Sequence, residues 1–348
     1  MVTTSNSIRW EPMSLMQVAD VWVTDMRKKK TESFYRSMWW GYVFNWTQNI
    51  DATIDDFING TFRFSPMITF RFSDQVIRAW EYKDKLILKF LRKIISPVLK
   101  YIILPCCYHL NGPTGIKNAI SFIKNSMNFE HFRYFIRADI KDYYASIDRN
   151  ILVQQTRKYF KDLRLCKYLK AVVTTAIDDG GEVKVPKLGI PRGSSLSPFF
   201  GALYLSGLDQ AFQQNTGISY CRYMDDIIIL AKTKRQFLSA KKRFQQILLS
   251  LKLKLSRSKT RMGEITKGFH FLGVNFAVSK NQQNNNKIHV TTLLHSRTIR
   301  RALDKVNAME EGAVNPVNVQ RYLSRWAAWW RFSCGLPFEV YLVNRRSG

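Results

Sequence analysis

The spacing of apolar residues changes several times along the chain, and each change predicts an element. MITFRF at 67–72 is strand-like. In TGIKNAISFIKNSM at 114–127, apolar residues recur every three to four positions, which predicts an amphipathic helix. RYFIRADI at 133–140 is apolar and β-rich, so we expect a buried strand that ends on Asp139.

The next hundred residues continue the alternation of helices and strands. FFGALYLSGLDQAF at 199–212 fits one buried helix. ISYCRYM and DIIILAK then fit two strands on either side of a tight turn that holds Asp225 and Asp226. We expect a charged helix at 234–251 and a further hairpin around GFHFLGVNF at 268–276.

Two helical regions carry more specific signals. The apolar segment 86–105 is interrupted by four cations and does not fit a membrane span, so it predicts a mostly buried helix, kinked or split near Pro97. After the polar spacer NQQNNN at 281–286, the tail predicts two helices, the second begun by Asn315 as N-cap and Pro316. Helices packed on a small mixed sheet predict an α+β fold.

Charge and cysteine usage narrow the class of partner. The chain has 54 Lys and Arg against 26 Asp and Glu, a net charge of +28, and residues 231–348 hold 23 of these cations against 5 acids. This surplus favours nucleic acid as partner, although a solvated basic surface or a ribosome-like protein without chemistry remains an alternative. Five Cys without metal spacing, and no secretory start, predict a cytoplasmic protein in a reducing compartment.

Two adjacent carboxylates in the stretch CRYMDDIIIL, at 221–230, require a positive partner because burying like charges is costly. Adjacent strands could bring Asp225 and Asp226 to Asp139. Three carboxylates form an oxygen-rich site of the kind that binds Mg²⁺, and two such ions support phosphoryl transfer. The alternative is an ordinary turn dipeptide that pairs with Arg222 or a lysine.

These motifs, taken in order, resemble those of reverse transcriptases over most of residues 65–335. The matching stretches are FRFSDQVIRAWEYKDKLILKFL, IRADIKDYYASID, GIPRGSSLSP, YMDD, LKLKLSRSKT and HFLGVNF. The resemblance implies that Asp139, Asp225 and Asp226 are catalytic and hold two Mg²⁺ ions, with Mn²⁺ as a substitute, and that the main chain of Ile140 joins the metal ligands.

The resemblance also implies a nucleotide site. Tyr144 takes the place of the aromatic residue that discriminates against a 2′-hydroxyl, where RNA-dependent RNA polymerases typically have a second acid. Lys259 would reach the triphosphate and protonate pyrophosphate. Gly193 would let the backbone approach the nucleotide, and Arg192 stands where the family usually has Gln. Arg78, with Arg71 as second choice, would contact the incoming phosphates.

Contacts to primer and template follow from the same resemblance. They involve Tyr223 and Met224 of the YMDD turn and the primer-grip residues Phe271, Leu272 and Gly273. A C-terminal thumb would hold the duplex through phosphate contacts made by Arg297, Arg300, Arg301, Arg321 and Arg325. A solvated helical tail is the alternative for this last set.

The implied architecture is a right-hand polymerase with an RRM-like antiparallel palm sheet and a helical thumb. We expect an N-terminal extension at 1–65, fingers at 66–135, a palm at 136–285 with finger-type insertions around 150–195, and a thumb at 286–348. With no room for an endonuclease after the thumb, no RNase H-like acids and VTT at 290–292 in place of the VTG of retron enzymes, the chain resembles stand-alone bacterial reverse transcriptases, many of them implicated in antiphage defence.

The predicted function is DNA synthesis on an RNA template, with the RNA/DNA hybrid and dNTPs as partners and a dedicated noncoding RNA as a further candidate. Template-independent or protein-primed DNA synthesis by the same fold remains an alternative. So does a catalytically idle palm that serves as an RNA-binding scaffold, although intact acids disfavour it.

Overall fold

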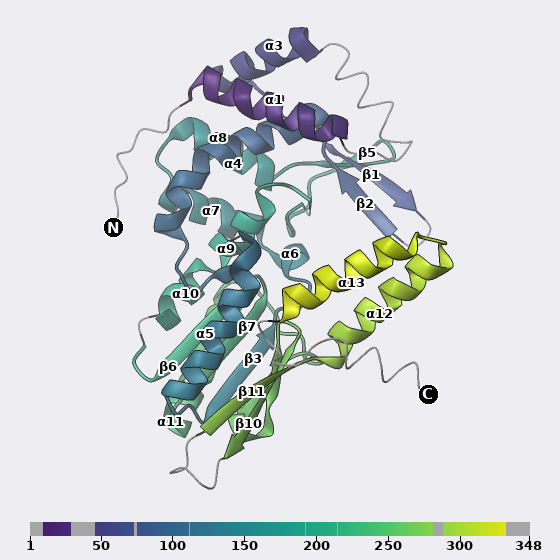
Figure 1. The fold of residues 1–348 in the computed structure, drawn as a ribbon. Helices are drawn as coiled ribbons and strands as arrows, with labels where there is room; N and C mark the ends of the chain where they lie inside the picture. The colour runs from purple at the N-terminus through teal and green to yellow at the C-terminus, as the bar shows by residue number, and fades with distance from the viewer. Residues whose placement is uncertain are drawn as a thin grey trace. The chain divides into compact units, whose positions relative to one another are not determined.

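The computed structural model describes residues 10–28, 46–72, 75–110, 112–191, 193–213, 215–280 and 288–331. Its chain divides into two compact units that interleave along the sequence. The first unit takes residues 1–104, 142–206 and 250–253, and the second takes residues 105–141, 207–249 and 254–348. Both combine helices with sheets, as expected for the α+β class (Figure 1).

The first unit is mainly helical. Its helices are α1 (Pro12–Lys28), α3 (Trp46–Asn59), α4 (Tyr82–Ile102), α6 (Tyr143–Ser146), α7 (Arg149–Tyr159), α8 (Leu163–Val173) and α9 (Ser197–Tyr204). Asp148 caps α7 by accepting hydrogen bonds from the backbone of Asn150 and Ile151. The rings of Phe57 and Tyr168 pack 4.9 Å apart, so α3 and α8 share a core.

A four-stranded sheet completes the first unit. Its strands are β1 (Met67–Phe72), β2 (Gln75–Ala79), β4 (Ile177–Asp179) and β5 (Glu182–Lys184), in the order β2-β1-β4-β5. β1 and β4 pair in parallel, whereas the two outer pairs are antiparallel hairpins.

The second unit is built on an antiparallel sheet of order β6-β7-β3-β8. The strands are β6 (Ile218–Tyr223), β7 (Asp226–Ala231), β3 (Tyr134–Asp139) and β8 (Arg261–Glu264). Helix α5 (Gly115–Phe129) packs against this sheet through an apolar cluster that includes Ile120, Ile123, Cys221, Ile228 and Leu230 (Figure 1). The unit also contains α10 (Ser206–Gln213) and α11 (Lys234–Ser250).

A second, three-stranded sheet and two helices follow along the chain. β9 (Phe269–Phe271), β10 (Val274–Lys280) and β11 (Ile288–Leu294) form an antiparallel sheet of order β11-β10-β9. Their side chains Phe269, Val274 and Val290 join the same core as α5. Helices α12 (Ser296–Glu311) and α13 (Pro316–Trp330) pack on each other through Val306, Val319 and Leu323.

Most elements expected from the sequence are present, with two corrections. The helix predicted at 199–212 is divided at Leu205 into α9 and α10, next to Ser206 and Gly207, which are weak helix formers. The helix predicted at 86–105 runs unbroken through Pro97 as part of α4, and is not split there. Asn315 caps α13 as expected, since its side chain accepts a hydrogen bond from the Val317 N–H.

Within the part of the chain that the structure describes, no helix is long and apolar enough to cross a membrane.

Candidate active site

Strand pairing places the first and last of the predicted acids opposite each other. Asp139 ends β3, Asp226 begins β7, and the two residues are direct partners in the antiparallel register. Directly opposed residues of such a pair have Cα atoms about 4.5–5.5 Å apart. Tyr223, at the end of β6, pairs with Asp226 from the other side. Asp225 therefore lies in a two-residue turn, while Asp226 belongs to the strand.

The turn is held in an uncommon backbone conformation by two side chains. Met224 has a φ of 55°, a left-handed conformation that a non-glycine residue adopts at a cost on the order of 1 kcal/mol. Its N–H donates to Nδ1 of His109 at 3.2 Å, and its carbonyl accepts from Nη1 of Arg222 at 3.1 Å. Because both polar groups of Met224 are bonded, the turn has a defined geometry.

Arg222 is itself fixed by a buried ion pair. Its side chain is fully buried, and its Nε and Nη2 bond the two carboxylate oxygens of Asp209 at 2.7 and 2.5 Å. The Tyr220 hydroxyl donates to the same carboxylate at 2.7 Å. Arg222 therefore pairs with Asp209 and, through its bond to the carbonyl of Met224, also supports the turn.

Two cations from outside the YMDD turn contact the acids. Nη2 of Arg137 lies 3.2 Å from Oδ1 of Asp226, and Arg137 lies on the same face of β3 as Asp139 because the two are two residues apart. Nζ of Lys259 lies 3.2 Å from both carboxylate oxygens of Asp139. Arg137 also donates to the main-chain oxygen of Lys259, so one network links β3, β7 and the segment before β8.

The electrostatics of the site are visible at Asp226. Its pKa is raised from 3.8 to about 6, and burial is the largest cause. The carboxylates of Asp225 and Asp139 raise the pKa further, whereas Arg137 and Lys259 lower it. Two neighbouring carboxylates thus make the ionised form of Asp226 less favourable. A cation bound nearby would stabilise this ionised form.

Whether these groups suit a metal can be judged from the donors. Among the described residues, no three or more His, Cys, Asp or Glu side chains are grouped so that they could hold a metal ion as they stand. The donor chemistry nevertheless fits a hard divalent cation, because Asp139 and Asp226 offer only oxygen and face each other in register. The side-chain ammonium of Lys259 now contacts both oxygens of Asp139, and its side chain is 56% exposed, so it is able to move away.

The predicted primer-grip hairpin is anchored to the C-terminal helices. Leu272 and Gly273 form the two-residue turn between β9 and β10, with φ of 48° and 81°. The carbonyl of Gly273 accepts hydrogen bonds from the His295 N–H at 2.9 Å and the Thr298 hydroxyl at 3.0 Å. Phe271 is fully buried in the core shared with α5, so it supports the turn from within.

The remaining predicted nucleotide residues lie in the first unit. Tyr144, in α6, lies beside Tyr143, and the bare Gly201 leaves room for its ring: an added Cβ would meet the Tyr144 hydroxyl oxygen at 3.3 Å. Gly193 has a φ of 84° and open space around it, as close approach of another molecule requires.

The basic residues predicted to bind phosphates differ in their exposure and in their ion pairs. Arg78 is exposed on β2, whereas Arg71 is bound to Asp179 at 2.6 Å, so the first choice is the better placed of the two. Arg192 lies outside the described residues. The five arginines predicted to hold the duplex are all exposed on α12 and α13: Arg297, Arg300, Arg301, Arg321 and Arg325.

Comparison with known proteins decides the family. The family described as "Reverse transcriptase (RNA-dependent DNA polymerase)" matches residues 65–276, well over half of the chain. The chain belongs to the reverse transcriptase family. The family predicted from the motifs is therefore confirmed, and with it membership in a family of RNA-directed DNA polymerases.

Two curated relatives are similar in sequence to parts of this reverse transcriptase. Protein YkfC of Escherichia coli (strain K12) is 22% identical in an alignment of 228 residues that covers 55% of this chain and 60% of YkfC. The putative COX1/OXI3 intron 1 protein of Saccharomyces cerevisiae is 21% identical over 187 residues, 51% of this chain and 21% of that protein. The chain thus spans less than two thirds of either relative.

Sequence reasoning missed three residues of the site. Arg137 could have been found, because its spacing from Asp139 places both on one strand face. His109 and Asp209 gave no local signal, since each reaches the YMDD turn or its support from a distant segment.

Proposed function

We propose that this reverse transcriptase copies RNA into DNA by adding deoxynucleotides to a primer. The primer 3′-hydroxyl attacks the α-phosphate of a dNTP, a new phosphodiester bond forms, and pyrophosphate leaves. The observation that carries the proposal is the register of β3 and β7, which sets Asp139 opposite Asp226 and next to the Asp225 turn.

Two Mg²⁺ ions, or Mn²⁺, would be held by Asp139, Asp225, Asp226 and the main-chain oxygen of Ile140. Bound there, such ions supply activation of the attacking hydroxyl and stabilisation of the leaving oxygen. The chain's own contribution is to hold the acids in place. The left-handed Met224 orients Asp225, and strand pairing fixes the other two carboxylates.

Lys259 would change partner during the reaction. In this structure its ammonium group neutralises Asp139. If Asp139 served as a metal ligand, the exposed Lys259 would be released from it. We propose that Lys259 contacts the triphosphate and gives its proton to the departing pyrophosphate.

Selectivity for deoxynucleotides is assigned to Tyr144, whose ring would collide with a 2′-hydroxyl. Gly193 would allow close approach of the backbone, and Arg78 and Arg192 would meet phosphates or bases. Tyr223 and Met224 would contact the primer end, together with the hairpin of Phe271, Leu272 and Gly273.

The larger assignments extend the same proposal. The fingers, palm and thumb boundaries at 66–135, 136–285 and 286–348 follow the order of the motifs, and the exposed arginines of α12 and α13 would contact the duplex backbone. A cytoplasmic role in antiphage defence, with a dedicated noncoding RNA as partner, is proposed from the likeness of the motifs to stand-alone bacterial enzymes.

The test is primer extension with purified protein, a primed RNA template, Mg²⁺ and dNTPs. We expect DNA synthesis that Asp225→Ala reduces at least about a thousandfold, because the loss of metal stabilisation is worth several kcal/mol and each 1.4 kcal/mol is tenfold in rate. Asp304→Ala, which removes an exposed acid from α12, serves as the matched control and should leave synthesis unchanged.

Three results would contradict this proposal. Equal synthesis by Asp225→Ala would remove the acids from the chemistry. Incorporation of NTPs as readily as dNTPs would indicate an RNA polymerase. RNA binding without any synthesis by the wild-type protein would favour the idle scaffold.

A further inference from the structure

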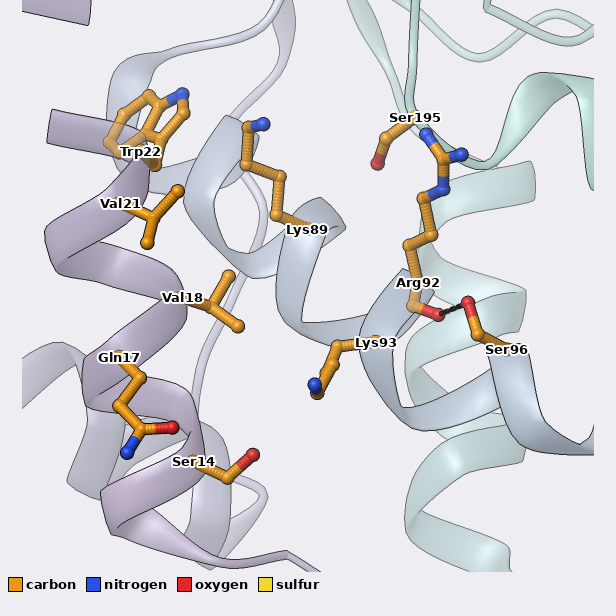
Figure 2. A pocket seen from close by; sticks show the side chains of 10 residues that line it. All are labelled: Ser14, Gln17, Val18, Val21, Trp22, Lys89, Arg92, Lys93, Ser96 and Ser195. Carbon is orange, nitrogen blue, oxygen red and sulfur yellow. Dashed lines mark hydrogen bonds between the residues drawn. The ribbon is translucent and has the colours of Figure 1, made fainter. Parts of the chain in front are cut away.

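A basic cavity lies in the first unit, apart from every residue assigned above to the reaction. Its volume is about 480 Å³, within the range of small-molecule sites. Figure 2 shows the ten residues that line it, which come from α1, α4 and the loop before α9: Ser14, Gln17, Val18, Val21, Trp22, Lys89, Arg92, Lys93, Ser96 and Ser195.

Among the described residues that line this cavity, three are cations and none is an acid. Lys89, Arg92 and Lys93 stand at positions i, i+3 and i+4 of α4, so they share one face of the helix. Like charges at this spacing repel one another and weaken a helix. An anionic ligand with several charges would relieve this repulsion.

The opposite wall is apolar and has a polar edge. Val18, Val21 and Trp22 of α1 face the cations across the cavity (Figure 2). Val21 is 63% exposed and offers apolar surface on this wall. Hydroxyl groups of Ser14 and Ser96, with the amide of Gln17, border the space between the two walls.

We propose that this cavity binds a free nucleoside triphosphate. The phosphates would lie against Lys89, Arg92 and Lys93, and the base would lie against Val18, Val21 and Trp22. Three cations on one lining match the charge of a polyphosphate, and the apolar wall offers a surface for one base. A nucleic-acid strand would instead require a series of aromatic platforms along a groove.

The cavity is connected to the loop that carries Gly193. Ser195, two residues further along, lines the cavity and donates a hydrogen bond to the carbonyl of Leu88 at 2.9 Å. Leu88 immediately precedes Lys89 on α4. A ligand bound at Lys89 and Ser195 would therefore contact the chain two residues from Gly193, which gives the site a route by which to regulate nucleotide use.

The test is photolabelling of the full chain with 8-azido-ATP, without template and with EDTA, so that the acids hold no metal. We expect saturable labelling within residues 12–28 or 82–102, located by peptide mass spectrometry. Arg92→Gln with Lys93→Gln should weaken ATP binding at least about tenfold, because each lost charge-assisted contact is worth about a factor of ten or more. Both side chains are exposed, so the variant should melt at the wild-type temperature.

The matched control removes two cations from a second basic cavity of the same unit, which Lys161 and Lys170 help to line. Lys161→Gln with Lys170→Gln changes the net charge equally and should leave ATP binding unchanged. Equal weakening by both double variants would overturn the proposal, as would labelling confined to residues outside α1 and α4. Stronger competition by single-stranded RNA than by ATP, at equal phosphate concentration, would overturn it in favour of a nucleic-acid strand.

Discussion

At the scale of single residues, the site depends on which cation meets which acid. Arg222, next to the acids in sequence, is committed to Asp209, while Arg137 and Lys259 contact Asp226 and Asp139. The buried pair of Arg222 and Asp209 supports the turn, since Nη1 of Arg222 also donates to the carbonyl of Met224. Asp139 is therefore paired with an exposed lysine, whereas Asp226 is paired with the buried Arg137.

His109 is expected to position the YMDD turn without touching substrate. His109→Ala removes the acceptor of the Met224 N–H, and small displacements of reacting groups cost up to about a hundredfold in rate. We expect kcat for single-nucleotide addition to fall about 10–100-fold, with little change in KM for dNTP. His109→Asn offers an acceptor oxygen in a similar place and should recover most of the rate. Wild-type kcat in His109→Ala would show that the turn holds its shape without this bond.

The raised pKa of Asp226 predicts how the stability of the metal-free protein depends on pH. An unfolded Asp has a pKa near 3.9, and the folded value is about 6, so the folded state binds the extra proton between these values. The stabilisation from this proton is full below about pH 4 and is lost as the pH rises through 6.

Asp226→Asn should therefore be more stable than wild type at pH 7.5, by about 1–3 kcal/mol in the free energy of unfolding, and equal to it near pH 4. Thermal unfolding in EDTA at both pH values measures this difference. A variant that melts below wild type at pH 7.5 would show that the Arg137 contact outweighs burial.

At the scale of elements, two hairpins of the second unit have two-residue turns, and both turns carry residues predicted to belong to the site. The β6–β7 turn presents Asp225, and the β9–β10 turn is clamped by the start of α12. Both turns use left-handed backbone at a non-glycine residue, Met224 and Leu272. Each depends on neighbouring segments for its shape, which links the acids to elements distant in sequence.

Gly273→Ala should loosen the contact between the β9–β10 turn and the C-terminal helices. The residue has a φ of 81°, and an added Cβ would lie 2.8 Å from Oγ1 of Thr298 and 3.2 Å from Trp330. We expect a loss of about 1–3 kcal/mol in stability, measured by chemical unfolding. Gly207→Ala is the control, because a Cβ there meets nothing within 4 Å and should be neutral or stabilising. A Gly273→Ala variant as stable as this control would show that the β9–β10 turn does not depend on close packing against the C-terminal helices.

At the scale of the whole molecule, the net charge of +28 bears on which partners the protein binds and not on its fold. Phosphate contacts release counterions, so the affinity for nucleic acid should fall steeply with salt, independently of base sequence. The exposed arginines on α12 and α13 are candidates for this binding.

Replacing Arg321 and Arg325 by Gln should weaken binding of an RNA/DNA duplex equally for unrelated sequences. The slope of log affinity against log salt should become shallower by roughly 0.9 for each lost contact, as measured by fluorescence anisotropy between 50 and 200 mM salt. Lys242→Gln with Arg243→Gln, on exposed positions of α11, controls for charge alone. An equal change of slope in both variants would show that the arginines of α12 and α13 have no specific role in duplex binding.

The sequence by itself predicted most of the elements, determined the family and pointed to the three acids. Apolar periodicity and capping residues act over a few positions, so MITFRF, TGIKNAISFIKNSM and Asn315 could be assigned from local patterns alone. The motif order carried the family for the same reason, because each motif is short and complete within itself.

Only the tertiary structure decided how these acids are held. Strand register put Asp139 opposite Asp226, and packing brought His109 to Met224 and Asp209 to Arg222. Such contacts join residues whose separation along the chain obeys no period, and burial rather than sequence proximity selects the partner of a charge. The division of the chain into two interleaved units has the same origin, since segments far apart in sequence share one core.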